Sequence, residues 1–439
     1  MVLDTNGEVR TITKPNFRSE RNCFVTAGST SDTPARTASP APGGRRFECV
    51  ATTLPGLEAV LSRELEAVGL TDVEPLRSAV RFSADQELLY LANLRARTAL
   101  RVLVPIARFA AATTDQLYQE CLAVPWQRYL SPSSTFAVRA LSSSPAGDDP
   151  RFVALRVKDA LVDAMRKRFG RRPNVDVRSP DVQITIHWDQ GGVVVNLDSS
   201  GESLHRRGYR SERTEAPLSE VLGAGMVLLS GWDRRSTLYN PMCGSGTIAI
   251  EAALIGADIA PGLLRQRFGF QSWKDYDETL WNRLHSEAVE QARTRSSRSG
   301  EVSRHPPVVA GDIDPEAVRV AVRNLERTGF TDLVRAMRRD LLEQEPPAAV
   351  GDHPVVIINP PYGKRLKEPE IETLYARIGD RLKEWYPGWD AWIISGNRAA
   401  MKRIGLRTAA RIPLFNGPIE CRYHHYPLYR STPDDRPTH

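Results

Sequence analysis

The residues best suited to chemistry are Asn359, Pro360, Pro361 and Tyr362, which directly follow the apolar run 355–358. Ligands bind beyond the carboxyl ends of the strands in open α/β sheets, so this loop is expected to face a ligand. The Asn359 side-chain oxygen and a proline carbonyl can together accept both hydrogens of an –NH2 group. The Tyr362 ring can stack on a base. We therefore predict a catalytic loop that acts on an amino nitrogen.

A second candidate site is the glycine-rich segment 240–247, which lies between a predicted strand and an apolar helix. Gly244 and Gly246 allow a tight turn and a close approach to a ligand. The start of the following helix offers free N–H groups to an anion. On its own, this segment also fits a nicotinamide-binding enzyme, although the full dinucleotide fingerprint is missing, or a plain turn between strand and helix.

Three aspartates follow predicted strands. Asp312 is expected to bind both ribose hydroxyls of a nucleoside-containing cofactor, because a carboxylate at the end of the second strand often does so. Asp314 precedes Pro315, and this order is typical of a helix N-cap followed by proline at the first helical position. Asp340 is placed to accept a hydrogen bond from an adenine amino group, and a surface aspartate without a ligand fits it equally well.

The fold that positions these loops is predicted from strand–helix alternation, which begins near residue 214. Such alternation is typical of a doubly wound, mainly parallel α/β sheet. The chain ends with an antiparallel pair around Asn416-Gly417, and the Arg- and Ser-rich stretch 291–305 is interpreted as an exposed loop. The strands are expected at 236–240, 307–311, 333–338, 354–358 and 390–395.

The net charge of +6 permits a polyanionic partner, although a mildly basic enzyme without nucleic acid fits it too. Clustered cations favour phosphate contact, with a solvated face as the alternative. The cations predicted to contact RNA are Arg166, Lys167, Arg168, Arg171, Arg172, Arg206, Arg207 and Arg210.

The five cysteines include no CxxC pair, so neither a zinc site nor a disulfide framework is expected, and no metal is predicted. No apolar run approaches the roughly 18 residues of a membrane span, and no secretory signal is recognised. These features favour a reducing cytoplasm.

Residues 240–251, 311–315 and 359–363 resemble the motifs of class I S-adenosylmethionine (SAM)-dependent methyltransferases that act on amino nitrogens. The likeness extends over nearly everything from 46 to 428. Over this range the chain is similar to the THUMP-containing half of bacterial large-subunit ribosomal RNA guanine-N2 methyltransferases. The further segments that carry the resemblance are 54–58, 172–176, 204–210, 216–220, 260–262 and 416–418.

This resemblance implies a Rossmann-like methyltransferase domain over 201–430, preceded by an α+β region. That region comprises a ferredoxin-like piece at 45–87 and a THUMP RNA-binding domain at 88–200. Residues 1–44, rich in Thr, Ser, Pro, Gly and Arg, are interpreted as a disordered tail, and 431–439 as a tail at the other end. Pro217 and Leu218 are expected to border the SAM pocket. The implied SAM contacts are Asn240, Pro241, Cys243, Gly244, Ser245, Gly246, Thr247, Asp312, Ile313, Asp340 and Asn359.

The function implied is SAM-dependent N2-methylation of a guanine in 23S ribosomal RNA. Two departures are noted: many bacterial relatives carry a second methylase for guanine N7, whose activity is expected to be absent here, and Asn240 stands where Asp is common. Transfer RNA guanine-N2 methylation and adenine-N6 methylation of a nucleic acid remain open as alternatives. So does a role as a non-catalytic RNA-binding assembly factor.

Overall fold

The computed structural model describes residues 2–3, 9–10, 46–141, 147–190, 192–210, 218–302, 308–329, 331–362 and 368–429. The interpretation of 1–44 and 431–439 as tails lies outside these ranges, apart from two short paired strands, β1 (Val2–Leu3) and β2 (Val9–Arg10). The remaining strands form two large sheets, one in each half of the chain.

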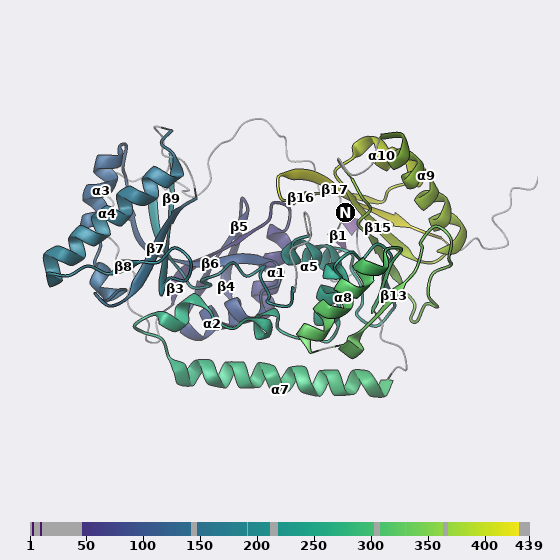
Figure 1. The fold of residues 1–439 in the computed structure, drawn as a ribbon, viewed down its shortest axis with the longest axis horizontal. Coiled ribbons are helices and arrows are strands. Elements are labelled where there is room, and N and C mark those ends of the chain that lie inside the picture. Colours follow the sequence, from purple (N-terminus) through teal and green to yellow (C-terminus); the bar gives the residue numbers. More distant parts are fainter. Residues whose placement is uncertain are drawn as a thin grey trace, which may run out of the picture.

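The N-terminal half is built on an eight-stranded sheet of order β4-β5-β3-β6-β10-β9-β7-β8 (Figure 1). The long strand β6 pairs with β3 near its start and with β10 towards its end, so one continuous sheet joins the two parts of this half. Its strands are β3 (Phe47–Thr53), β4 (Thr71–Leu76), β5 (Ala79–Ala84), β6 (Ala99–Phe109), β7 (Thr135–Ala140), β8 (Asn174–Val175), β9 (Val182–Asp189) and β10 (Gly192–Asp198). Its helices are α1 (Glu58–Ala67), α2 (Gln86–Arg95), α3 (Thr114–Leu122) and α4 (Pro150–Phe169).

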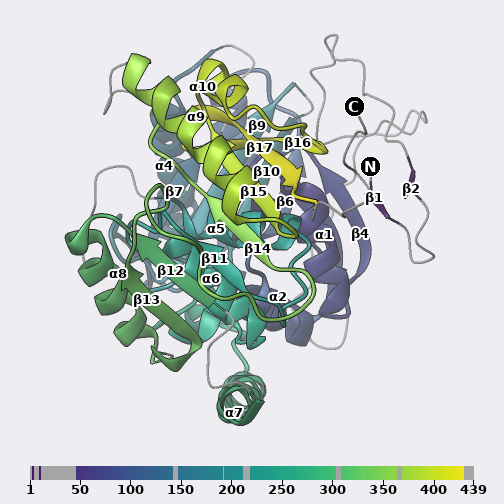
Figure 2. The same ribbon diagram turned by 90° about the vertical axis from the view of Figure 1, so that its right-hand side faces the viewer.

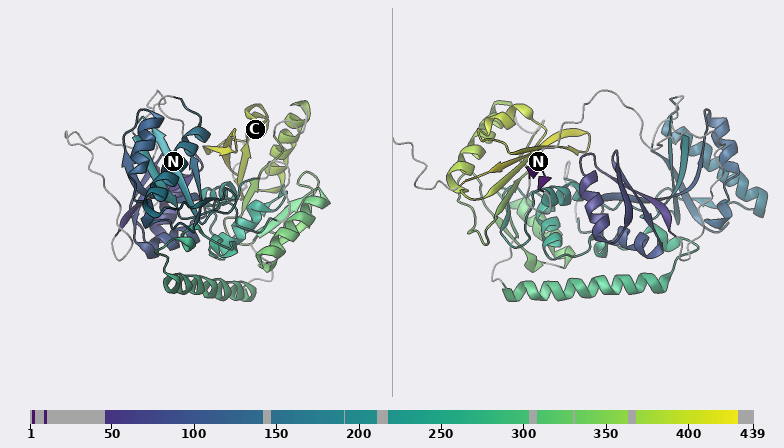
Figure 3. Two further views of the ribbon diagram at one scale, coloured as in Figure 1. Left: turned by 60° about the vertical axis from the view of Figure 1, so that its left-hand side comes forward. Right: turned by 180° about the vertical axis from the view of Figure 1, so that it is seen from behind.

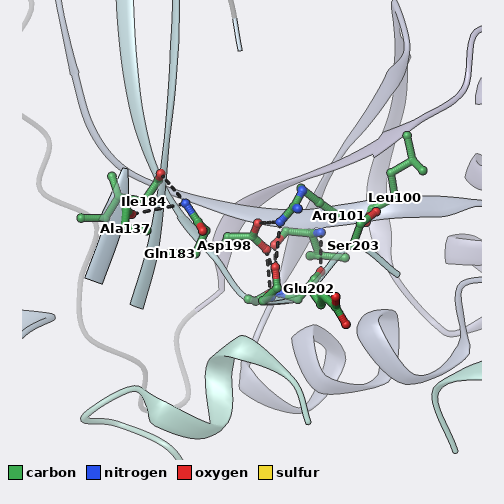
Figure 4. Close-up of polar contacts among 12 residues, drawn as sticks. Leu100, Arg101, Ala137, Gln183, Ile184, Asp198, Glu202 and Ser203 are labelled. Carbon is green, nitrogen blue, oxygen red and sulfur yellow. Dashed lines mark hydrogen bonds and ion pairs between the residues drawn. The ribbon is translucent and has the colours of Figure 1, made fainter. Parts of the chain in front are cut away.

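An ion pair fixes the point where the chain leaves this sheet. Arg101 on β6 pairs with the fully buried carboxylate of Asp198, and it also donates to the carbonyl of Gly201 across 2.8 Å (Figure 4). Burial raises the pKa of Asp198, while Arg101 and two backbone N–H groups lower it. Ser203 donates to the carbonyl of Leu100 across 3.0 Å. The segment that follows is therefore held against β6 before it crosses to the second half.

The C-terminal half is a doubly wound domain around a seven-stranded sheet of order β13-β12-β11-β14-β15-β17-β16 (Figure 2). The first five of these strands are parallel and β17 is antiparallel to β15, which confirms the predicted sheet and its terminal hairpin. Core side chains of α5, α6 and α8 cover one face, and those of α9 and α10 cover the other. The strands are β11 (Leu238–Asn240), β12 (Val308–Asp312), β13 (Val334–Arg338), β14 (Val355–Ile358), β15 (Asp390–Ser395), β16 (Ala410–Asn416) and β17 (Ile419–Pro427). The helices are α5 (Glu220–Leu229), α6 (Thr247–Gly256), α7 (Glu278–Val302), α8 (Pro315–Thr328), α9 (Glu368–Trp385) and α10 (Arg398–Arg403).

The prediction of an exposed loop at 291–305 is wrong for 291–302, because α7 continues as a helix to Val302, while 303–305 lie outside the described residues. Trp281, Leu284, Ala288 and Ala292 recur at helical spacing and are buried. The first three pack on the N-terminal half and Ala292 packs in the core of the C-terminal domain. Figures 1 and 3 show the helix running along one side of both halves. Once the first turns of a helix are packed, further turns can form with few apolar residues. The Arg- and Ser-rich composition was therefore a poor indicator of a loop.

The two halves also share a hydrophobic core. Leu57, at the start of α1, is fully buried in one cluster with Leu222 of α5 and Leu414 of β16. The glycine at position 56 has a φ of +93°, and its Cα faces the carbonyl oxygen of Pro413 so closely that a Cβ there would lie 2.3 Å away. The loop 54–57 therefore seats the N-terminal half directly on the terminal hairpin.

Disulfides, metal-binding clusters and membrane-spanning helices are all absent from the described residues. Cys49, Cys121, Cys243 and Cys421 are buried and form no disulfides. No His, Cys, Asp and Glu side chains there gather in a group of three or more that could hold a metal ion. Nor does any helix in those ranges combine the length and apolar character of a membrane span.

Candidate active site

A cavity of about 740 Å³ opens at the carboxyl edge of the parallel strands. Its size is typical of a site for a small molecule or cofactor. The strand order β13-β12-β11-β14 places the loops that follow these four strands side by side, as the sequence predicts. The predicted site residues that line this cavity are Pro241, Cys243, Gly244, Ser245, Thr247, Asp312, Ile313, Asp340, Asn359, Pro360, Pro361 and Tyr362.

The glycine-rich loop after β11 is tied to the end of β12. Gly244 has a φ of +53°, a conformation that favours glycine, and its N–H donates to a carboxylate oxygen of Asp312 across 2.9 Å. The N–H of Cys243 donates to the carbonyl of Gly311 across 2.9 Å. Burial is the main cause of the raised pKa of the Cys243 thiol, which makes it a poor nucleophile. The loop is thus a preformed cradle rather than a reactive centre.

Asp312 and Asp314 have separate roles. Burial raises the pKa of Asp312, and hydrogen bonds from the N–H groups of Gly244 and Asp314 counteract that rise. Asp314 caps α8 by accepting from the N–H of Glu316 across 2.9 Å, with Pro315 in the first turn, which confirms the predicted N-cap. Asp312 therefore remains the acceptor suited to a ribose.

The cavity lining also combines an acceptor, Asp340, with an apolar side chain, Ile313. Asp340 uses one carboxylate oxygen to accept from the N–H of Leu342 across 2.8 Å. Ile313 is 58% exposed and lies on the cavity wall, so its side chain can rest against a flat ring. An aspartate beside an exposed isoleucine suits an adenine, because the aspartate can accept from the amino group while the isoleucine covers one face.

Asn359 is positioned at the end of β14 with an unused acceptor. Its Oδ1 is buried and has no hydrogen-bond partner among the described residues. A buried polar atom without a partner costs free energy, so this oxygen is a candidate acceptor for a ligand in the cavity. Asn359 directly follows β14, whose four residues are all buried, so its backbone is anchored on that side.

Tyr362 is held from the terminal hairpin, by a residue whose role the sequence analysis missed. The Asn416 amide nitrogen donates to the Tyr362 hydroxyl across 2.9 Å, and both residues line the cavity together with Ile419. Burial raises the pKa of Tyr362, so its hydroxyl stays protonated. The segment 416–418 was noticed only as part of the resemblance, and nothing local in it indicates a contact with residue 362.

Two predicted cofactor residues lie behind the cavity wall. Asn240 is fully buried and its amide donates to the carbonyl of Ile357 across 2.9 Å, so it braces β11 against β14 instead of lining the cavity. Gly246 is also absent from the lining and packs against Ala321 of α8. Of the two expected bordering residues, Leu218 lines the cavity, while Pro217 lies outside the described residues.

The predicted RNA contact of Arg207 is wrong. Arg207 is 1% exposed and forms an ion pair of 3.3 Å with Glu251, which is itself fully buried on α6. It also donates to the backbone carbonyls of Arg97 and Leu204. A charge with so many internal partners is not available to a phosphate. Spacing in a charge run does not reveal which members point inward.

The other predicted cations divide by exposure. Arg206 is exposed, whereas Arg210 is largely enclosed, with an oxygen of Glu220 lying 2.8 Å from it. At the end of α4 and just beyond it, the remaining cations form an exposed group that we name the α4 cluster. The α4 cluster consists of Arg166, Lys167, Arg168, Arg171 and Arg172.

Three family models match successive parts of the chain. The first, described as the RlmL ferredoxin-like domain, matches residues 48–103, and the THUMP domain matches 111–198. The third, described as the RMKL-like methyltransferase domain, matches residues 207–425. The glycine-rich loop, Asp312, Asp340 and the Asn359 loop all fall in this third match.

Similar proteins cover most of the chain. "Putative RNA methyltransferase slr0064" of Synechocystis sp. is 39% identical over 381 residues, which are 86% of this chain and 96% of that protein. "Ribosomal RNA large subunit methyltransferase K/L" of Syntrophotalea carbinolica is 41% identical over 378 residues, which are 85% of this chain and 52% of that protein. The chain therefore spans about half the length of this longer relative. The crystal structure of SMU.472 complexed with SAH has a TM-score of 0.77 and 30% identity, covering 89% of this chain and 100% of that one.

Proposed function

Because the chain belongs to the family of THUMP-containing, SAM-dependent RNA methyltransferases related to RlmL, we propose that it methylates N2 of a guanine in 23S ribosomal RNA. The observation that carries this proposal is the buried Oδ1 of Asn359 in the cavity wall, which has no hydrogen-bond partner among the described residues. The relatives that are named as large-subunit ribosomal RNA methyltransferases support ribosomal RNA as the substrate. The pocket itself supports an amino nitrogen as the target.

The residues around the cavity fit SAM. Asp312 would bind the ribose hydroxyls, while Asp340 and Ile313 would hold the adenine. The glycine-rich loop and the start of α6 would receive the anionic methionine end. When bound, SAM supplies a methyl group on a positively charged sulfur, which is strongly activated for transfer.

The protein's part in the reaction is to position the amine. The Oδ1 of Asn359 and the carbonyl of Pro360 would accept the two amine hydrogens, which fixes the nitrogen and increases its electron density. Tyr362 would stack on the target base and offset part of the few kcal/mol needed to unstack it. No general base is assigned, since the amine proton can pass to water after transfer.

The N-terminal half would bind RNA at a surface separate from the active site. The α4 cluster is exposed and lies within the THUMP match, and its cations suit the phosphates of an RNA backbone. Arg206 is a further exposed cation on the segment that leads to the methyltransferase domain. We further propose action in the reducing cytoplasm, where the four cysteines of the described ranges, all buried and without disulfides, would remain thiols.

The test is nucleoside mass spectrometry of ribosomal and transfer RNA from a strain that lacks this chain. We expect one N2-methylguanosine to disappear from 23S RNA and to return when the gene is restored. Loss from transfer RNA would shift the proposal to transfer RNA guanine-N2 methylation. Loss of N6-methyladenosine would favour the adenine alternative, and unchanged modification of every RNA would favour a non-catalytic assembly factor.

A further inference from the structure

The segment that leads from the THUMP region into the methyltransferase domain reaches the cavity through Arg210. Its guanidinium donates to the carbonyl of Leu218 and, across 3.1 Å, to the hydroxyl of Thr247. Leu218 and Thr247 both line the cavity. An oxygen of Glu220 lies 2.8 Å from Arg210 Nε, and the Arg210 side chain is 20% exposed. This cation is therefore engaged at the cavity rather than available to RNA.

Thr247 marks the end of the cavity that suits the methionine part of SAM. It is the first residue of α6, and free N–H groups at a helix start favour an anion. The carboxylate of the methionine part is the anionic group of SAM. Asp312, the acceptor suited to the ribose, lies on a different strand and bonds the loop at Gly244. The two ends of the cofactor would therefore meet different residues.

We propose that Arg210 is a positioning residue of the cofactor site, which holds Thr247 and the Leu218 carbonyl where the methionine end of SAM binds. Arg210 lies near the start of the methyltransferase match and, without lining the cavity itself, holds two residues that do. Arg327 of α8 fixes Arg210 in turn by donating to its backbone carbonyl across 3.1 Å. This inference rests on SAM binding in this cavity, which the proposed function shares, and not on the identity of the RNA.

The test compares two ligands, of which only one carries the methionine end. S-adenosylhomocysteine carries the amino-acid end, whereas 5′-methylthioadenosine has the same nucleoside without it. In calorimetry on the full chain, we expect Arg210→Ala to lower affinity for S-adenosylhomocysteine about ten-fold or more, since several hydrogen bonds to a charged group are lost. Affinity for 5′-methylthioadenosine should change less than about two-fold. Arg206→Ala, an exposed neighbour, should change neither affinity, whereas Asp312→Ala should weaken both ligands.

A second variant covers the case in which Arg210→Ala does not fold because Glu220 is left buried without its cation. The double variant Arg210→Gln with Glu220→Gln replaces the pair by two neutral amides, and the same ligand-selective loss is expected. Unchanged affinity for S-adenosylhomocysteine, or an equal loss for both ligands, would overturn the inference. If the wild-type chain methylated no RNA, the proposed function would fail, but a ligand-selective loss would still support the role of Arg210.

Discussion

The amide nitrogen of Asn416 donates a hydrogen bond to the hydroxyl of Tyr362 across 2.9 Å. The two residues belong to different parts of the sheet: Asn416 ends β16 at the terminal hairpin, and Tyr362 follows β14. Both line the cavity, and the bond fixes the hydroxyl end of the tyrosine ring. The terminal hairpin therefore helps to build the surface on which the target base would stack.

This contact predicts a non-additive pair of variants. Asn416→Ala should raise KM for the RNA substrate about five-fold, because a hydrogen bond of about 1 kcal/mol no longer orients the ring. In a Tyr362→Phe background, which already lacks the hydroxyl, Asn416→Ala should have little further effect. Steady-state kinetics of the four proteins measures the coupling. Effects that simply add would show that Asn416 acts independently of Tyr362.

Asp312 is predicted to bind the cofactor and Asp314 to stabilise a helix. Asp312→Ala should weaken S-adenosylhomocysteine roughly ten- to hundred-fold in calorimetry, since hydrogen bonds to a charged acceptor contribute about 1.5–3 kcal/mol each. Asp314→Ala should lower the free energy of unfolding by about 1 kcal/mol through loss of the cap, with affinity almost unchanged. Equal affinities of the wild type and Asp312→Ala would remove Asp312 from the site.

Arg207 is predicted to stabilise the junction between the two halves. Arg207→Ala leaves the carboxylate of Glu251 buried without its cation, so the free energy of unfolding should fall by about 3–5 kcal/mol. The matched control Arg206→Ala removes an exposed, solvent-screened arginine and should cost about 0.5 kcal/mol or less. Urea unfolding of both variants provides the comparison. A similar small loss in both would mean that the buried pair contributes little.

The buried position of His205 leads us to predict that the free energy of unfolding falls as the pH is lowered. Burial is the main cause that lowers the pKa of His205 from 6.5 to about 4, with a further contribution from Arg206 and neighbouring arginines. Between these values the unfolded chain binds a proton at this histidine while the folded chain does not, so stability is lost as the pH falls from 6.5 towards 4. His205→Gln should lose less stability than the wild type between pH 7 and pH 5 in urea unfolding. Parallel losses would contradict this role.

Much of the site follows from local sequence. Apolar runs such as 355–358 predict buried strands, and the polar residues after them predict the edge at which a ligand binds. The cap formed by Asp314 and Pro315 depends only on neighbouring residues, so the local rule was sufficient. The cavity accordingly gathers residues from four separate loops that the sequence had marked.

What the sequence did not reveal depends on contacts between distant residues. Arg206 and Arg207 are adjacent in one charge run, yet Arg206 is exposed and Arg207 meets Glu251 inside the fold. Asn416 reaches Tyr362 only because β17 returns beside β15 and carries β16 with it. The end of α7 was mistaken for a loop because its packing is set by turns earlier in the same helix.

The central claim is that the side-chain oxygen of Asn359 holds the amine that receives the methyl group. The most direct measurement is single-turnover methyl transfer by Asn359→Ala to RNA from a strain that lacks this chain, with S-adenosylhomocysteine affinity measured in parallel. We predict a rate that falls by about 100-fold or more, as for the loss of one positioned hydrogen-bonding group at a reacting centre, with affinity within about two-fold of wild type. Transfer at the wild-type rate by this variant would contradict the claim.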